Sequence, residues 1–127
     1  MFIPAHELVV KAKASITEIS LEQADRLLGD ATVLLLDVRE PGEYQAGHLP
    51  GALNIPRGML EFVISANPAL QDTDRPIMVY CKTGGRAALA AQTLASMAFI
   101  RVSSLAGGYD AWHASARQTA QPKISFD

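Results

Sequence analysis

The residue with the clearest chemical potential is Cys81, the only cysteine in this chain of 127 residues. It follows the apolar run 76–80 and opens the segment Cys81-Lys82-Thr83-Gly84-Gly85-Arg86, after which an Ala-rich stretch begins. Where a strand passes through a Gly-containing loop into a helix, backbone N–H groups can converge on one point. A thiolate at that point is stabilised, so the segment predicts a cysteine nucleophile inside an anion-binding loop.

A lone cysteine also has a plainer interpretation, because free cysteines are most often small buried hydrophobic residues. The order of strand, cysteine, two glycines, arginine and helix favours the nucleophile. Gly84 and Gly85 permit backbone angles that other residues resist, and Lys82 and Arg86 add positive charge. With a single cysteine the chain forms no internal disulfide and suits a reducing compartment, so we expect a cytoplasmic protein.

Strand and helix patterns alternate along the chain and must position this loop. The apolar runs 32–37 and 76–80 are typical of strands buried on both faces of a parallel sheet. Shorter strand patterns lie at 16–19, 53–55 and 101–105, and helical patterns at 5–14, 20–28, 40–45, 58–65, 86–98 and 109–116. The alternation predicts an α/β fold, with a parallel β-sheet core and helices on both faces.

In a parallel sheet, ligands bind beyond the carboxyl ends of the strands, which here points to residues 37–40 and 81–86. Asp37 and Arg39 therefore lie near the edge of the expected site. We expect Asp37 to accept hydrogen bonds from nearby backbone N–H groups rather than to act as an acid or base.

The charged residues of the loop each have two interpretations. Arg86 either contacts an anionic substrate or braces the loop through a bidentate pair with a carboxylate, and its place at a helix start favours bracing. Glu43 and Asp37 are the candidate partners. Lys82 either attracts an anion or is a solvated lysine.

The charge balance excludes some classes of function. Eleven basic and 13 acidic residues give a net charge of -2, and they are scattered without any run of lysine and arginine. We therefore expect neither nucleic acid nor a membrane as a partner. The N-terminal sequence has no basic segment followed by a long apolar one, so we predict no signal peptide.

Four motifs, in order, resemble the single-domain rhodaneses, a family of sulfurtransferases. Cys81-x-x-Gly84-x-Arg86 resembles the active-site loop of that family, and Asp37-Val-Arg39-Glu40 resembles its element after a central strand. The other two are Glu43-Tyr-x-x-Gly47-His-Leu-Pro-Gly51-Ala-x-Asn54-Ile-Pro56 and Leu105-x-Gly107-Gly108-x-x-x-Trp112. The resemblance implies one rhodanese-like domain over 15–116, with an N-terminal helical extension (1–14) and a C-terminal tail (117–127).

The resemblance implies a persulfide mechanism without a metal or organic cofactor. Cys81 would take the outer sulfur of thiosulfate, or of a persulfide donor, and pass it to cyanide, a thiol or a protein acceptor. The loop from Lys82 to Arg86 would hold the persulfide, while Asp37, Arg39 and Glu43 would support it. In this setting, His48 is expected to hold its Gly-His-Leu-Pro-Gly turn, and Trp112 to pack in the core or beside the site.

Two alternatives remain open at this point. The chain could be a rhodanese-like docking or sulfur-relay module with little thiosulfate turnover. It could also act on phosphate or arsenate, although the similar loops of cysteine-based phosphatases have five residues between cysteine and arginine. Only four lie between Cys81 and Arg86, and this smaller loop favours sulfur.

Overall fold

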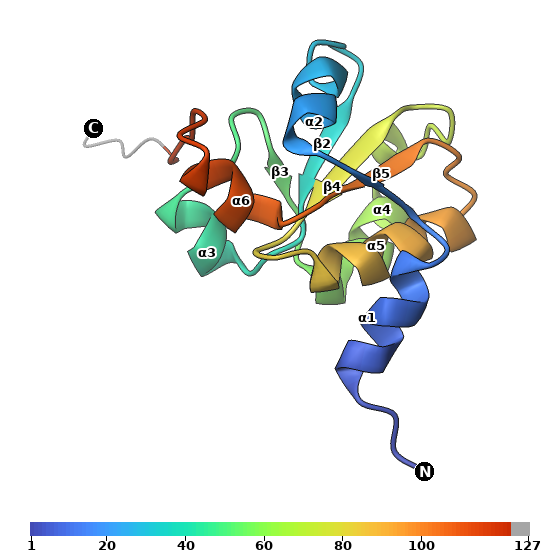
Figure 1. Cartoon of the computed structure of the whole chain (residues 1–127). Helices are drawn as coiled ribbons and strands as arrows, with labels where there is room; N and C mark the ends of the chain where they lie inside the picture. The colour runs from blue at the N-terminus through green and yellow to red at the C-terminus, as the bar shows by residue number, and fades with distance from the viewer. Residues whose placement is uncertain (123–127) are drawn as a thin grey trace.

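The two most apolar runs of the sequence become neighbouring strands inside a five-stranded parallel sheet (Figure 1). The computed structural model describes residues 1–122. The strands are β1 (Thr17–Ile19), β2 (Leu34–Asp37), β3 (Leu53–Asn54), β4 (Ile77–Tyr80) and β5 (Val102–Leu105), in the spatial order β1-β5-β4-β2-β3. All four neighbouring pairs are parallel, which confirms the predicted fold class.

Helices cover both faces of this sheet. They are α1 (Ala5–Lys13), α2 (Leu21–Leu27), α3 (Pro41–Ala46), α4 (Leu60–Ala66), α5 (Gly85–Ser96) and α6 (Gly108–Ala114), and short 3-10 turns lie at Arg57–Met59 and Pro68–Leu70. The turn at Pro68–Leu70 has no counterpart in the sequence prediction. It forms because the Asn67 side chain accepts a hydrogen bond from the Ala69 N–H and Pro68 starts the turn.

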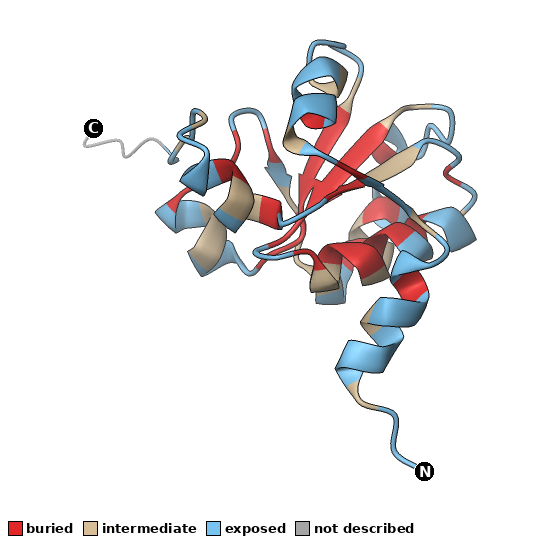
Figure 2. Ribbon diagram, in the orientation of Figure 1, coloured by how far each residue is buried: buried red, intermediate tan, exposed pale blue. Residues whose placement is uncertain are grey.

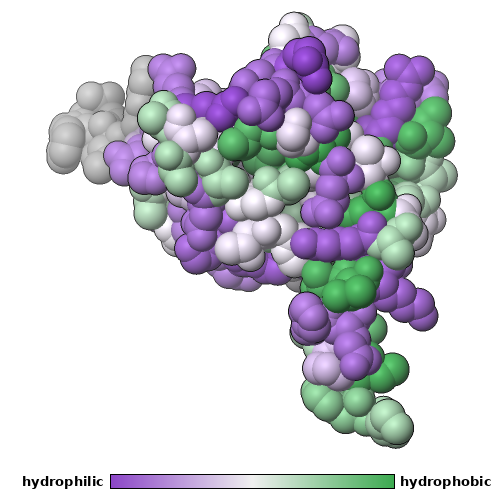
Figure 3. Space-filling model, in the orientation of Figure 1, coloured by the Kyte–Doolittle hydropathy of each residue, from purple (hydrophilic) through white to green (hydrophobic). Residues whose placement is uncertain are grey.

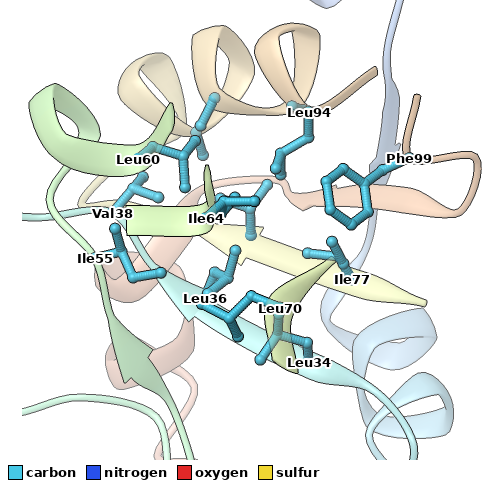
Figure 4. Close-up of a cluster of buried hydrophobic side chains, with 14 of the residues drawn as sticks. Leu34, Leu36, Val38, Ile55, Leu60, Ile64, Leu70, Ile77, Leu94 and Phe99 are labelled. Carbon is cyan, nitrogen blue, oxygen red and sulfur yellow. The ribbon is translucent and has the colours of Figure 1, made fainter. Parts of the chain in front are cut away.

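Alternate side chains of the central strands form two separate cores. Leu34 and Leu36 of β2 join Ile77 and Val79 of β4 on the face covered by α4 and α5 (Figure 4). Leu35, Met78 and Tyr80 point to the opposite face, where they meet α2 and α6. Both central strands are therefore buried throughout (Figure 2). Burial on two faces explains why these strands read as continuous apolar runs.

Local signals in the sequence set several helix boundaries. The S-x-x-Q sequence that begins the predicted helix 20–28 forms a capping box at α2, because Ser20 and Gln23 exchange both side-chain to backbone hydrogen bonds. At α3, Pro41 occupies the first turn, and the Glu43 side chain accepts a hydrogen bond from the Glu40 backbone N–H at 3.1 Å. In α5, alanines 87, 88, 90 and 91 are buried, and their small side chains let this helix lie close to the sheet.

The N-terminal helix α1 projects from the body of the protein and packs its second half against α5 (Figure 1). Apolar surface extends along α1 and the residues before it, with Phe2 85% and Leu8 47% exposed (Figure 3). Within residues 1–122, no helix has the length and apolar character that crossing a bilayer requires.

The chain beyond α6 turns back onto the domain. Its backbone pairs Ala120 with His48 through two hydrogen bonds, and Arg117 forms an ion pair with Asp25 of α2. Residues 117–122 of the predicted tail are therefore in contact with two parts of the fold, and residues 123–127 lie outside the described residues.

Candidate functional site

Cys81 lies directly after β4, and its sulfur is the focus of the loop that follows. The Gly84 N–H donates to Sγ at 3.1 Å and the Ala87 N–H donates at 3.3 Å. One donor belongs to the loop and the other to the first turn of α5, the end of a helix where N–H groups lack helical partners. Only 1% of Cys81 is exposed, so these N–H groups act on the sulfur with little competition from water.

The loop depends on a glycine where it enters the helix. Gly84 has φ +122°, a conformation that L side chains rarely adopt, and its N–H faces the sulfur as a result. Gly85 follows as the first residue of α5, while Thr83 and Lys82 are exposed. Of the two glycines named from the sequence, Gly84 is thus the one whose backbone conformation requires glycine.

The N-terminal helix borders this loop, a contact that the sequence analysis missed. Lys13 Nζ lies 3.8 Å from the position that a Cβ on Gly84 would occupy, and Val9 lies 3.6 Å from the corresponding position at Gly85. Lys13 also lies 3.7 Å from Glu18. Residues 1–14 therefore add a cationic side chain beside the loop. The apolar spacing of Val9 and Ala12 was the available signal that this helix has a packed face.

Helix α6 holds the outer side of the same loop. The Tyr109 N–H donates to the Cys81 carbonyl oxygen at 2.8 Å, and the Asp110 N–H donates to the Lys82 carbonyl oxygen at 3.0 Å. Gly108 permits this approach, since an added Cβ there would lie 2.5 Å from the first of these oxygens. The motif from Leu105 to Trp112 therefore holds Cys81 and Lys82 in place through backbone hydrogen bonds.

Arg86 and Glu43 form a bidentate ion pair beside the loop. The two guanidinium to carboxylate distances are 2.7 and 3.0 Å, and about a third of each side chain is exposed. Hydrogen bonds from Arg86 lower the pKa of Glu43 from 4.5 to about 2, against the opposing effect of its partial burial. Of the two carboxylates named from the sequence, Glu43 is the partner of Arg86.

We expect Glu43→Gln to destabilise the protein by about 1 kcal/mol at pH 7, the usual size for a partly exposed charged pair. Because the folded pKa of Glu43 is depressed, its contribution is full above about pH 4.5 and is lost as the pH falls towards 2. In urea unfolding measurements, the free energies of unfolding of the wild-type protein and of Glu43→Gln should therefore become equal as the pH falls through this range.

The matched control is Glu7→Gln, which changes an exposed glutamate without an ion-pair partner among residues 1–122. A Glu43→Gln deficit that persists unchanged to pH 2 would contradict the ion-pair explanation.

Asp37 and Arg39 form a second, buried network beside the first. The Asp37 carboxylate accepts hydrogen bonds from the Arg39 side chain at 2.7–3.1 Å and from the Arg39 backbone N–H at 2.9 Å. Tyr80, which the sequence analysis did not name, donates its hydroxyl proton to the same carboxylate at 2.7 Å. Burial and this hydrogen bond raise the pKa of Tyr80, so its hydroxyl remains a donor.

The remaining residues named from the sequence lie around the site. Lys82 forms an exposed ion pair with Asp110. His48 Nδ1 lies 2.9 Å from the Tyr44 carbonyl oxygen, and the two rings stack with centroids 3.8 Å apart, a structural placement within the turn. Trp112 is buried in the core with Leu35 and Met78.

Comparisons with known proteins agree with this architecture. The family model of the rhodanese-like domain matches residues 20–115. A Rhodopseudomonas palustris protein of unknown function, described as a possible tyrosine phosphatase, is 31% identical with a TM-score of 0.86, over 94% of this chain and 96% of that one.

Two similar structures carry the names of sulfurtransferases. A homodimeric polysulfide-sulfur transferase from Wolinella succinogenes is 29% identical with a TM-score of 0.76, over 95% of this chain and 90% of that one. A human single-domain sulfurtransferase is 31% identical with a TM-score of 0.71, over 76% of this chain and 95% of that one.

Proposed function

Because this chain belongs to the family of rhodanese-like domains, we propose that it transfers a sulfane sulfur from thiosulfate, or from a persulfide donor, through a persulfide on Cys81. The observation that carries the proposal is the pair of backbone N–H groups, from Gly84 and Ala87, that converge on Sγ. Two such donors favour an anionic sulfur over a neutral one.

The first step loads the enzyme. The Cys81 thiolate attacks the outer sulfur of thiosulfate, the sulfur–sulfur bond of the donor breaks, and sulfite leaves with the bonding electrons. Cys81 then carries one extra sulfur with a negative charge. The N–H groups of Gly84 and Ala87 donate to Sγ, and the ion pair of Arg86 with Glu43 fixes the first turn of α5, to which Ala87 belongs.

The second step removes the outer sulfur from the Cys81 persulfide. A thiolate or cyanide attacks the outer sulfur of the persulfide, the bond to Sγ breaks, and Cys81 returns as a thiolate. No net oxidation or reduction of the protein occurs over the cycle, so one cysteine is sufficient. A thiol that must return to this state in every cycle suits a reducing compartment such as the cytoplasm.

Intact-protein mass spectrometry tests the proposal directly. Incubation with thiosulfate should add the mass of one sulfur, and a thiol reductant should remove it. Reversal is essential to the test, because two added oxygens have nominally the same mass and a sulfinic acid is not reduced by thiols. No gain on a protein whose Cys81 can be alkylated would favour another donor or a docking and relay module.

The description of the Rhodopseudomonas palustris protein makes phosphatase activity the competing outcome. Four residues separate Cys81 and Arg86, and Arg86 is already paired with Glu43 instead of being free for a phosphoryl group. We therefore expect no hydrolysis of an aryl phosphate above background under conditions in which the persulfide forms.

A further inference from the structure

A hollow of about 250 Å³ lies beside the loop from Cys81 to Arg86, called the catalytic loop below, on the side that faces α3 and α6. Its lining consists of Arg39, Glu43, Ala46, Gly47, Lys82, Tyr109 and Asp110. Lys82 follows Cys81 directly, and Glu43 is paired with Arg86, so the hollow adjoins both ends of the loop. It is smaller than the clefts of ~300–1,000 Å³ that hold drug-sized ligands, and it suits a molecule of a few carbon atoms.

Arg39 gives this hollow a buried cationic donor. Its side chain is only 4% exposed, and Nε and Nη2 are bonded to Asp37 and to the Gly47 carbonyl oxygen. Nη1 has no hydrogen-bond partner among residues 1–122. In that same part of the chain, the one fully enclosed side-chain polar atom without a partner is Ser104 Oγ. Nη1 is therefore not fully enclosed, and Arg39 is one of the residues that line the hollow.

The surroundings hold this guanidinium in one orientation. The Tyr109 ring lies over it, with Cζ 4.4 Å from the ring centroid. The Tyr109 hydroxyl in turn lies 2.5 Å from where a Cβ on Gly47 would be, so only glycine leaves room for it there. An arginine fixed by an aromatic ring and a carboxylate loses little entropy when its free N–H groups bind an anion.

Lys82 provides a second cation at the rim, and it is the lining residue that directly follows Cys81 in the chain. Lys82 and Asp110 form an exposed ion pair, which an entering anion can exchange at small cost because exposed pairs contribute little. The other carboxylate of the lining, Glu43, is occupied by Arg86. The open donor is thus Arg39 Nη1, and Lys82 becomes a second donor when an anion exchanges with Asp110; together they suit one small anionic group.

We propose that this hollow binds the carboxylate of a small thiol that accepts the sulfur. The inference rests on the persulfide chemistry proposed above. With its carboxylate on Arg39 and Lys82, the thiolate of such an acceptor lies next to the loop and attacks the outer sulfur of the Cys81 persulfide. The bond between that sulfur and Sγ breaks, Cys81 leaves as a thiolate, and the acceptor departs as a persulfide, with no outside oxidant.

Binding is tested first with acceptor analogues that cannot react. (Methylthio)acetate and (methylthio)ethanol differ in the carboxylate, and neither has a thiol, so the result is independent of turnover. In amide NMR titrations we expect saturable shifts at Gly47, Tyr109 and Asp110, with a Kd at least about tenfold lower for the carboxylate. Equal Kd values, or shifts confined to other parts of the protein, would overturn the proposal.

Variants then assign the donors. Lys82→Gln should reduce the preference for the carboxylate about threefold or more, whereas Lys11→Gln, an exposed lysine of α1 outside the hollow, should leave it unchanged. Arg39→Lys keeps a positive charge beside Asp37 but removes the Nη1 N–H groups. It should therefore reduce the preference for the carboxylate analogue further. Should Arg39→Lys fail to fold, the Lys82 and Lys11 pair still decides the question.

The kinetic test separates this inference from the proposed function. The loaded enzyme should transfer sulfur to mercaptoacetate with a KM at least about tenfold below that for mercaptoethanol, with similar kcat for the two. If the carboxylate analogue binds but no persulfide forms on Cys81, both the proposed function and the acceptor role are wrong, and the hollow is only a carboxylate site. Loading with equal KM values would leave the proposed function standing and overturn the acceptor site.

Discussion

Cys81→Ser is expected to abolish sulfur loading and thiocyanate formation while the domain stays folded. A serine hydroxyl is not ionised near pH 7 and forms no stable bond to a sulfane sulfur, so turnover should fall at least about 10³-fold, to the background without enzyme. The same two N–H groups, from Gly84 and Ala87, can donate to a serine oxygen. We therefore expect the free energy of unfolding to change by about 1 kcal/mol or less.

The readouts for this variant are intact mass after thiosulfate and the rate of thiocyanate formation from cyanide. Alkylation of the wild-type protein is the matched control, because Cys81 is the only thiol and its modification should cause an equal loss. Thiocyanate formation by Cys81→Ser at the wild-type rate would show that the nucleophile is assigned wrongly.

The second large effect is expected for Gly108→Ala, at the contact between α6 and the catalytic loop. Gly108 has φ +57°, and a Cβ would lie 2.5 and 2.7 Å from the carbonyl oxygens of Cys81 and Lys82. The backbone conformation costs an L residue about 1–2 kcal/mol, and crowding against backbone atoms adds about as much, so we expect a loss of about 3 kcal/mol. Displacement of the loop by even about 1 Å should lower sulfur loading about 100-fold.

Gly51→Ala separates the cost of the backbone conformation from the crowding against the loop. Gly51 has φ +82°, and a Cβ there would meet nothing within 4 Å, so this change introduces the backbone cost without a clash. Urea unfolding should show a loss of about 1–2 kcal/mol for Gly51→Ala, with loading by thiosulfate nearly normal. Equal stability and equal loading in the two variants would mean that the fit of α6 against the loop has no part in positioning Cys81.

Much of the fold followed from local signals in the sequence. The central strands β2 and β4 were predicted because they are buried on both faces and are therefore apolar at every position. The start of α2 was predicted because Ser20 and Gln23 satisfy each other's backbone groups without help from the rest of the chain. Such features depend on a few adjacent residues, which is why one sequence is sufficient to find them.

The partners inside the site depend on strand register, which the sequence does not display. Asp37 and Tyr80 are neighbours across β2 and β4, 43 positions apart in the chain, and only this register brings the tyrosine hydroxyl to the carboxylate. Enclosed with Tyr80 and Arg39, Asp37 is unavailable to Arg86, and Glu43 of α3 takes that place. The sequence named both carboxylates as candidate partners of Arg86 but could not choose between them, and only Glu43 has that role.

The position of β1 in the sheet has a consequence for the order in which the protein is built. β1 lies near the start of the chain, but its partner in the sheet is β5, near the end, with Thr17 opposite Ser103. During synthesis, β2 and β4 are complete well before β5, so the strand that ends in Asp37 and the strand that leads to Cys81 can pair before β1 has its partner. The long loop closure between β1 and β5 therefore comes late, whereas α1 can pack as soon as its partner α5, which precedes β5 in the chain, has been made.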